Sequence, residues 1–206
     1  MPEHGDQRLE TDWGDPRFLE TGTARQRRAW HVLQDLGVLE DLKAFEPIFV
    51  GTIPIDVDIA DSDIDVICAA GELAALEDAI RASYEKRSGF RCSYRPINGV
   101  ESLVATFEHD GFTLEIFGQC RPTREQDAYI HMVAEHKLLL SAGPKLKEEV
   151  RRLKSRGLKT EPAFATALAL QGDPYDAIAL LRHADDEQLI RLLHDRGFLG
   201  PAAAVR

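Results

Sequence analysis

Hydrophobic and polar positions divide the chain into a part that mixes helix-type and strand-type spacing and a later part with helix-type spacing only. Apolar residues recur at helical spacing from Thr23 to about Leu36, before Gly37, and again from Leu73 to Tyr84. Short apolar or alternating runs predict five strands, at 48–50, 63–69, 91–96, 102–108 and 112–117. The first part is therefore expected to be a sheet with helices around it.

Turn residues between the later runs indicate how those strands connect. Asn98-Gly99 and Asp110-Gly111 stand between the last three predicted strands and are strong signals for tight hairpins. The segment 53–59 also alternates, but Pro54 has no backbone N–H and cannot occupy a central ladder position. The last three strands should therefore form an antiparallel meander.

After Pro122 the spacing predicts helices at 123–141, 145–155, 161–170, 174–182 and 185–196. Thr160 and Asp173 each precede an early helical proline, which is typical of an N-cap. The predicted fold class is α/β (α+β), a mixed β-sheet with flanking helices followed by a C-terminal helical bundle. We divide the chain into an N-terminal arm (1–22), an α/β domain (23–121) and a helical region (122–206).

Composition restricts the class of protein. Of 206 residues, 44% are hydrophobic and 29% charged, which is typical of a globular protein and excludes a wholly disordered chain. No apolar run approaches the roughly 18 residues of a membrane span, and the first residues lack a secretory signal, so we expect a cytoplasmic protein. The three cysteines are too widely spaced for a disulfide framework or zinc site.

Charge is unevenly distributed along the chain. The net charge of −10 argues against a protein that coats duplex DNA. Residues 53–65 hold five aspartates and no base, which favours a bound cation there. Residues 145–159 hold seven bases and two acids. That stretch either steers RNA or a nucleotide toward a cleft or is a solvated helix face, and we favour the second interpretation.

Two aspartates on one predicted strand have the clearest chemical content. Side chains at i and i+2 share a strand face, so Asp63 and Asp65 should point the same way and repel each other unless a cation lies between them. Glu115 lies on a later strand of the same expected sheet and supplies a third carboxylate. Such a set fits Mg²⁺ that also binds substrate phosphates, and Gly51 and Thr52 are suited to contact a phosphate.

The pattern of Gly51-Thr52 followed by Asp63-Ile64-Asp65-Val66 resembles the DNA polymerase β nucleotidyltransferase superfamily. Within it, the chain is similar to a bacterial family described as domain of unknown function 4269, over roughly 18–181. Further matching segments are Arg25-Gln26, Glu115-Ile116-Phe117-Gly118-Gln119, His131-Met132 with Glu135, Lys159 to Ala165 and Gly172 to Tyr175. The resemblance implies a nucleotidyltransferase-like sheet on which Asp63, Asp65 and Glu115 hold Mg²⁺ (or Mn²⁺), and in which Glu115 helps to activate the attacking hydroxyl.

Other residues are weaker candidates. Arg25 and Lys159 could each contact a phosphate, the latter because it precedes a helix N-terminus. His131 and Glu135 stand at i and i+4 and could line the cleft with Gln126, although we favour a solvated or locally paired His131. The spacing of His131, Glu135 and His136 fits no zinc-protease motif. The aspartate-rich segment lacks the glycine and glutamate of an EF-hand.

The sequence supports three functional hypotheses. The leading one is a Mg²⁺-dependent nucleotidyltransferase that moves NMP from an NTP to an unidentified hydroxyl or amine. The second is a catalytically inactive nucleotide- or RNA-binding module of the same fold. The third is an interaction protein whose helical half docks a partner and whose acids are merely solvated.

Overall fold

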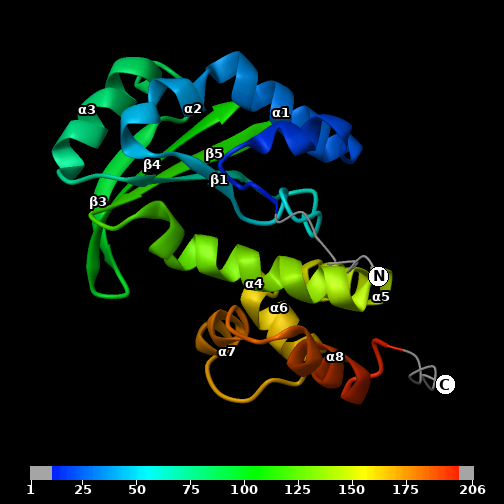
Figure 1. Cartoon of the computed structure of the whole chain (residues 1–206). Coiled ribbons are helices and arrows are strands. Elements are labelled where there is room, and N and C mark those ends of the chain that lie inside the picture. Colours follow the sequence, from blue (N-terminus) through cyan, green and yellow to red (C-terminus); the bar gives the residue numbers. More distant parts are fainter. Residues whose placement is uncertain (1–10, 200–206) are drawn as a thin grey trace, which may run out of the picture.

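A five-stranded mixed sheet forms the centre of the computed structural model, which describes residues 11–199 (Figure 1). The strand order is β1-β2-β5-β4-β3. Strands β2 and β5 are parallel, and every other neighbouring pair is antiparallel. The strands are β1 Ile48–Val50, β2 Ile64–Ala69, β3 Arg91–Ile97, β4 Val100–His109 and β5 Phe112–Gln119. The predicted fold class is confirmed, and only β2 starts later than expected, after Asp63.

The two hairpin turns form where the sequence placed them. Asn98 and Gly99 have φ angles of 50° and 77°, and Asp110 and Gly111 have 45° and 73°. Positive φ at both central residues is the geometry of a two-residue hairpin turn whose twist matches that of the strands. The predicted meander β3-β4-β5 is thus confirmed, with strands one to three residues longer than predicted.

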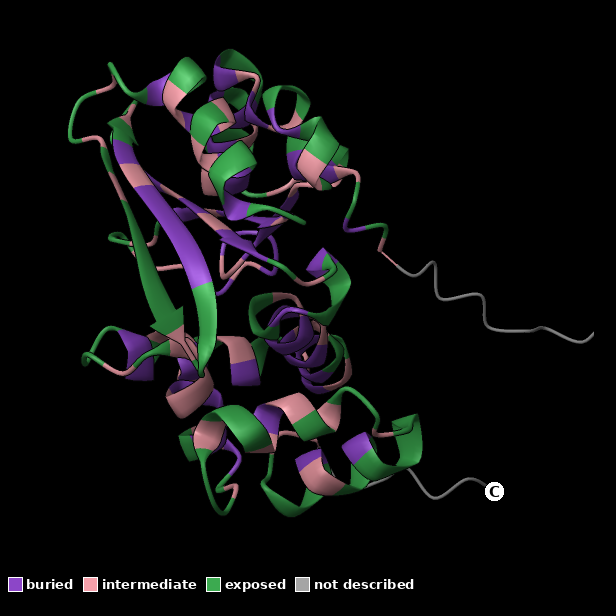
Figure 2. Cartoon of the chain, turned by 90° about the vertical axis from the view of Figure 1, so that its left-hand side faces the viewer, coloured by how far each residue is buried: buried purple, intermediate pink, exposed green. Residues whose placement is uncertain are grey.

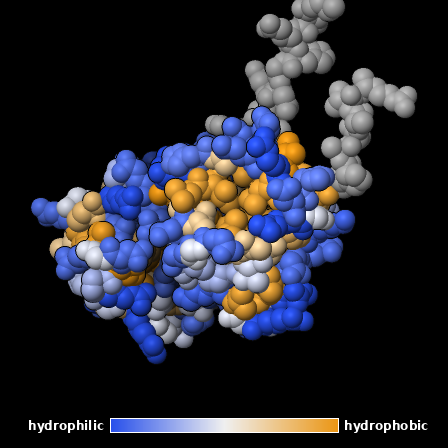
Figure 3. Space-filling view, turned by 90° about the horizontal axis from the view of Figure 1, so that it is seen from below, coloured by the Kyte–Doolittle hydropathy of each residue, from blue (hydrophilic) through white to orange (hydrophobic). Residues whose placement is uncertain are grey.

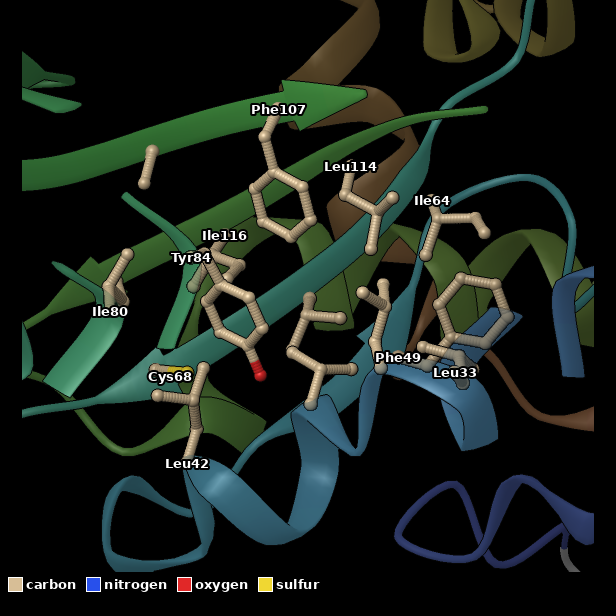
Figure 4. Packing of buried hydrophobic residues seen from close by; sticks show 14 of the residues in the cluster. Leu33, Leu42, Phe49, Ile64, Cys68, Ile80, Tyr84, Phe107, Leu114 and Ile116 are labelled. Carbon is tan, nitrogen blue, oxygen red and sulfur yellow. The ribbon is translucent and has the colours of Figure 1, made fainter. Parts of the chain in front are cut away.

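Helices α1 Ala24–Leu36, α2 Val38–Asp41 and α3 Leu73–Tyr84 cover one face of the sheet (Figure 1). Thr23 and Gln26 form a reciprocal capping box at the start of α1, and Gly37 ends it in the left-handed conformation. The core beneath these helices includes Tyr84, whose ring stacks on Phe107 at a centroid distance of 4.9 Å (Figure 4). The short helix α2 was not predicted, because four residues are too few to show a period.

Five helices pack on the opposite side of the sheet. They are α4 Asp127–Ala142, α5 Pro144–Lys154, α6 Thr160–Ala167, α7 Pro174–Leu181 and α8 Asp186–Asp195. The helix predicted at 123–141 is divided into a 3₁₀ turn, Thr123–Glu125, and α4. Helix α6 ends earlier than predicted, before Ala169 at φ 47°, and Lys159 rather than Thr160 is its N-cap. Asp173 caps α7 as expected.

The segment before α1 packs against both sides of the sheet. Trp13 is buried in the core with α4–α8, whereas Leu19, in the 3₁₀ helix Pro16–Thr21, is buried in the core with α1–α3. Residues 11–22 of the proposed N-terminal arm therefore pack against the rest of the protein, and residues 1–10 of that arm lie outside the described residues. The proposed boundary near residue 121 falls between β5 and the 3₁₀ turn before α4.

Burial follows the centre of the sheet and fades toward its β3 edge, where most residues are exposed (Figure 2). Seen from below, part of the surface is formed by neighbouring hydrophobic residues (Figure 3). Exposed large apolar side chains of the helices α4, α7 and α8 are Leu140, Leu180 and Ile190. Within residues 11–199, no helix combines the length and hydropathy needed to cross a membrane.

Candidate functional site

A pocket of about 410 Å³ lies between one face of the sheet and the helices that follow it. Its first wall, the strand wall, comes from β1, β2 and β5, the residues after β1 and the turn between β3 and β4. Its second wall, the helix wall, comes from α4, α6 and the start of α7. The polar lining of the strand wall includes Thr52, Asp65, Glu115 and Gln119, and that of the helix wall includes Asp127, His131, Glu135, Lys159, Thr160, Glu161 and Tyr175.

Two acids from distant parts of the sequence meet on the strand wall. Asp65 and Glu115 are register partners on the parallel strands β2 and β5, so their side chains leave the same face of adjacent strands, about 5 Å apart. Burial raises the pKa of Asp65 to about 7, with further contributions from the charges of Glu115 and Asp63. Burial also raises the pKa of Glu115, against the opposing charges of Arg95 and Lys159. The site therefore favours either protons or a cation.

Gly51 permits the close approach of Asp65 to the end of β1. Its φ angle is 85°, and a Cβ atom at this position would collide with Oδ2 of Asp65. A residue with a side chain would therefore be strained in its backbone and would also displace the carboxylate. Thr52, the next residue, lines the pocket and donates a hydrogen bond from its hydroxyl to Oγ of Ser62 at 3.2 Å.

Asp63 is not in the pocket lining. It precedes the first residue of β2 and is exposed. Its charge still raises the pKa of Asp65 and of Glu115. Across residues 11–199, no three His, Cys, Asp or Glu side chains are grouped so that they could hold a metal ion. Two carboxylates, Asp65 and Glu115, remain on the strand wall of the pocket, which fits Mg²⁺ that takes its other ligands from water and phosphates.

Two further candidates lie outside the pocket and have structural partners. The guanidinium of Arg25 donates to the carbonyl oxygen of Ser62 at 2.7 Å, and its Nε lies 3.4 Å from Oδ2 of Asp58. Gln126 was expected on the cleft wall, but it is fully buried. Its side-chain amide donates hydrogen bonds to the carbonyl oxygens of Cys68 and Arg121. Its amide thus ties the start of α4 to the end of β2.

The helix wall contains a group of polar residues that the sequence showed only in part. His131 and Glu135 are both buried on α4, and Nδ1 of His131 lies 3.2 Å from Oε1 of Glu161 on α6. The ring of Tyr175 lies 5.9 Å from the ring of His131. His131 is therefore locally paired rather than free. Glu161 and Tyr175 were not named as site residues, although both lie inside segments that carry the family resemblance.

Burial raises the pKa of Glu135 well above its usual value, and the charge of Glu161 raises it further, whereas Lys154 lowers it. Burial alone would raise the pKa of Glu161 too, but its hydrogen bond with His131 lowers the net value. Lys154 is buried on α5, and burial lowers its pKa to about 8. Nothing in the sequence distinguished Lys154 from the other bases of its helix except its place beside apolar residues.

The aspartate-rich segment is neutralised mainly by the basic helix α5. Asp56 pairs with Lys147 at 2.7 Å and with Arg151 at 2.6 Å. Asp58 lies 3.6 Å from Arg151, and Nζ of Lys154 donates to the carbonyl oxygen of Val57. The interpretation that this whole segment awaits a cation is therefore wrong for Asp56 and Asp58. The basic stretch is likewise neither a free RNA-binding surface nor wholly solvated.

Comparison with known proteins supports the family resemblance and the fold. The family described as "Domain of unknown function (DUF4269)" matches residues 31–181. No curated protein matches the chain.

Among solved structures, a cytoplasmic RNA terminal U-transferase has 14% identity and a TM-score of 0.50, with coverage of 84% of this chain and 66% of that one. The polymerase core of TRAMP, an RNA surveillance complex, has 14% identity and a TM-score of 0.46, covering 77% and 55%. Cid1, described with RNA terminal uridylyl transferase activity, has 13% identity and a TM-score of 0.48, covering 76% and 48%. The chain spans about half the length of the last two. At 14% identity, the likeness to the U-transferase is one of fold alone, a nucleotidyltransferase-like fold.

Proposed function

This chain belongs to the family described as Domain of unknown function (DUF4269), and we propose that it is a Mg²⁺-dependent nucleotidyltransferase of the DNA polymerase β superfamily. The observation that carries the proposal is the register pairing of Asp65 with Glu115 in a pocket, with Gly51 shaped to admit the Asp65 carboxylate. The reaction would move NMP from an NTP to an acceptor hydroxyl or amine.

In this reaction, the acceptor atom forms a bond to the α-phosphorus, the bond from that phosphorus to the β-phosphate oxygen breaks, and pyrophosphate leaves. Bound Mg²⁺ or Mn²⁺ would supply charge neutralisation for the triphosphate. Asp65 and Glu115 would hold the metal, with Asp63 at the exposed start of β2 as the third acid. Glu115 would also accept the proton of the attacking group, a role supported by its raised pKa and by its position in the pocket.

Phosphate contacts would come from both walls. Gly51 and Thr52 lie beside Asp65 on the strand wall, and Lys159 lies on the helix wall near enough to Glu115 to lower its pKa. Arg25 is a weaker candidate, because its guanidinium already contacts Ser62 and Asp58. We therefore assign Lys159 as the main protein cation for the triphosphate.

The test is incubation with α-labelled NTPs and Mg²⁺ or Mn²⁺, with wild type beside Asp65→Asn and Asp63→Asn. Asp78→Asn, on the exposed side of α3, is the matched control. Label transfer by wild type and Asp78→Asn, with a loss of about 100-fold or more in Asp65→Asn, would support the enzyme. Metal-dependent NTP binding without transfer in any variant would instead assign the inactive nucleotide-binding module.

A further inference from the structure

Acidic side chains dominate the helix wall as well as the strand wall. Three of its pocket residues are carboxylates, Asp127, Glu135 and Glu161, and they face two basic ones, His131 and Lys159. A metal at Asp65 and Glu115 would neutralise the strand wall only. The negative charge of the helix wall must therefore be balanced by other groups.

Two of these three acids have partners within the chain. Asp127 accepts a hydrogen bond from the Asn98 amide at 2.9 Å and lies 3.5 Å from Arg121. Glu161 is paired with His131 at 3.2 Å. These contacts satisfy the two carboxylates, so neither by itself indicates a ligand.

Glu135 differs from both. Its side chain is 3% exposed, it lines the pocket, and its Oε1 atom is buried without a hydrogen-bond partner in the described part of the chain. Lys154 contributes charge but directs its Nζ to the Val57 carbonyl at 2.9 Å. A buried carboxylate oxygen without a partner is costly to a folded protein, so it indicates a group that the ligand supplies.

The chemistry of this position restricts that group. A hydrogen-bond donor would satisfy the buried oxygen atom of Glu135. A positive charge on that donor would stabilise the ionised form of Glu135 against its raised pKa and would also offset the nearby Glu161. A phosphate would be repelled by the same two acids. The volume of the pocket, about 410 Å³, lies within the range of small-molecule sites.

We propose that the helix wall binds a protonated amino group, with Glu135 as its main ligand and Glu161 beside it, and that the acceptor is a small amine-bearing molecule. The role of this molecule as acceptor rests on the proposed transfer reaction, whereas binding of the amine is inferred from the residues of the pocket alone. RNA, whose backbone is anionic, is a poor fit to this wall.

The first experiment measures binding by calorimetry without NTP or metal, using two matched pairs of probes. These are 1,4-diaminobutane against 1,4-butanediol, and glucosamine against glucose. Wild type should bind the amine of each pair and not its hydroxyl analogue. Glu135→Gln should weaken amine binding about tenfold or more, since it removes the charge from the hydrogen bond while preserving the shape of the side chain.

Glu187→Gln, on α8 and paired with Arg191 at the surface, is the matched control for the lost negative charge and should bind like wild type. Glu161→Gln should weaken binding by a smaller factor and serves in place of Glu135→Gln if that variant does not fold. Equal binding of amine and hydroxyl probes overturns the proposal. So does an amine preference that survives in both Glu135→Gln and Glu161→Gln.

The second experiment separates this inference from the proposed function. Metal-dependent NTP binding tests the strand wall, and amine binding without NTP tests the helix wall, so each can fail alone. In the transfer assay, label should reach amine-bearing acceptors and not an RNA oligonucleotide. A Glu135→Gln variant that changes which NTP binds, while amine binding is unchanged, would assign this wall to the nucleobase instead and overturn the proposal.

Discussion

The segment 53–65 contains two kinds of aspartate, which differ in the charge of the side chains beside them. Asp56 lies between Lys147 and Arg151 of α5, so its charge is balanced within the chain. Asp65, nine residues later, lies beside Glu115, and its pKa is raised to about 7. Aspartates in one short segment thus have different roles, since Asp56 forms a structural ion pair and Asp65 is a candidate ligand. The number of charges in the segment does not distinguish these roles, whereas the residues that contact each aspartate do.

The largest expected effect on stability comes from substituting Gly51, because this glycine permits the close approach of Asp65. Gly51→Ala should lower the free energy of unfolding by about 2–4 kcal/mol, because it adds both backbone strain at positive φ and a collision with the Asp65 carboxylate. Gly172→Ala is the matched control, since its φ of 87° is similar and no atom lies within 4 Å of the added Cβ. Denaturant unfolding of both variants measures the difference. If both variants lose the same free energy of unfolding, the contact between Gly51 and Asp65 does not contribute to the loss.

Removing the structural tie should have the next largest effect. Asp56→Asn should lower the free energy of unfolding by about 1–2 kcal/mol, because it leaves Lys147 and Arg151 without their half-buried partner. Asparagine tolerates the positive φ of 57° at this position, so the backbone is preserved. Asp61→Asn, an exposed position in the same segment, should change stability by less than about 0.5 kcal/mol. A neutral Asp56→Asn would remove the distinction between the two kinds of aspartate.

Asp65→Asn should have the opposite sign from Asp56→Asn. In chelator at pH 8, it should melt about 2–4 °C higher than wild type, because the folded protein no longer holds a buried carboxylate beside Glu115. The folded-state pKa of Asp65 is raised, so folding binds a proton and wild-type stability falls as pH rises from about 4 to 7. The gap between variant and wild type should open over that range. A lower melting temperature for Asp65→Asn at pH 8 would contradict the clustered-acid interpretation.

Added Mg²⁺ should produce the smallest effect. At a concentration equal to its Kd, it should stabilise wild type by about 0.4 kcal/mol, or about 1 °C in melting temperature. Asp65→Asn should lose this shift and Asp78→Asn should keep it. Calorimetry of the three proteins across a series of Mg²⁺ concentrations provides the measurement. A shift of the same size in Asp65→Asn would place the metal elsewhere.

Local signals in the sequence predicted most of the secondary structure. The N-cap at Asp173 and the two hairpin turns each depend on residues within a few positions of one another. The errors have the same local scale, such as the early end of α6. Parallel pairing of β2 with β5 is different, because it joins residues about 50 positions apart and leaves no spacing signal of its own.

The candidate site was predictable to the extent that it depends on the strand alternation. Asp65 and Glu115 followed from that alternation and from the family resemblance, but Asp63 precedes the strand by one residue and leaves the pocket. Pairing of Asp56 with Lys147 spans 91 positions and could not be read from the chain. Glu161 and Lys154 reach their places through the packing of α5 and α6, so only the fold makes their chemistry visible.

The strand order also determines when the two acids meet during folding. Strands β3, β4 and β5 join through two-residue turns, so their pairing closes short loops and forms early. Pairing of β2 with β5 has to close a loop that contains α3, β3 and β4, so we expect this contact to form later and more slowly. On this order, we expect Asp65 and Glu115 to stay apart, each in water, until late in folding. Their mutual repulsion would then arise at a step in which hydrophobic burial is available to offset it.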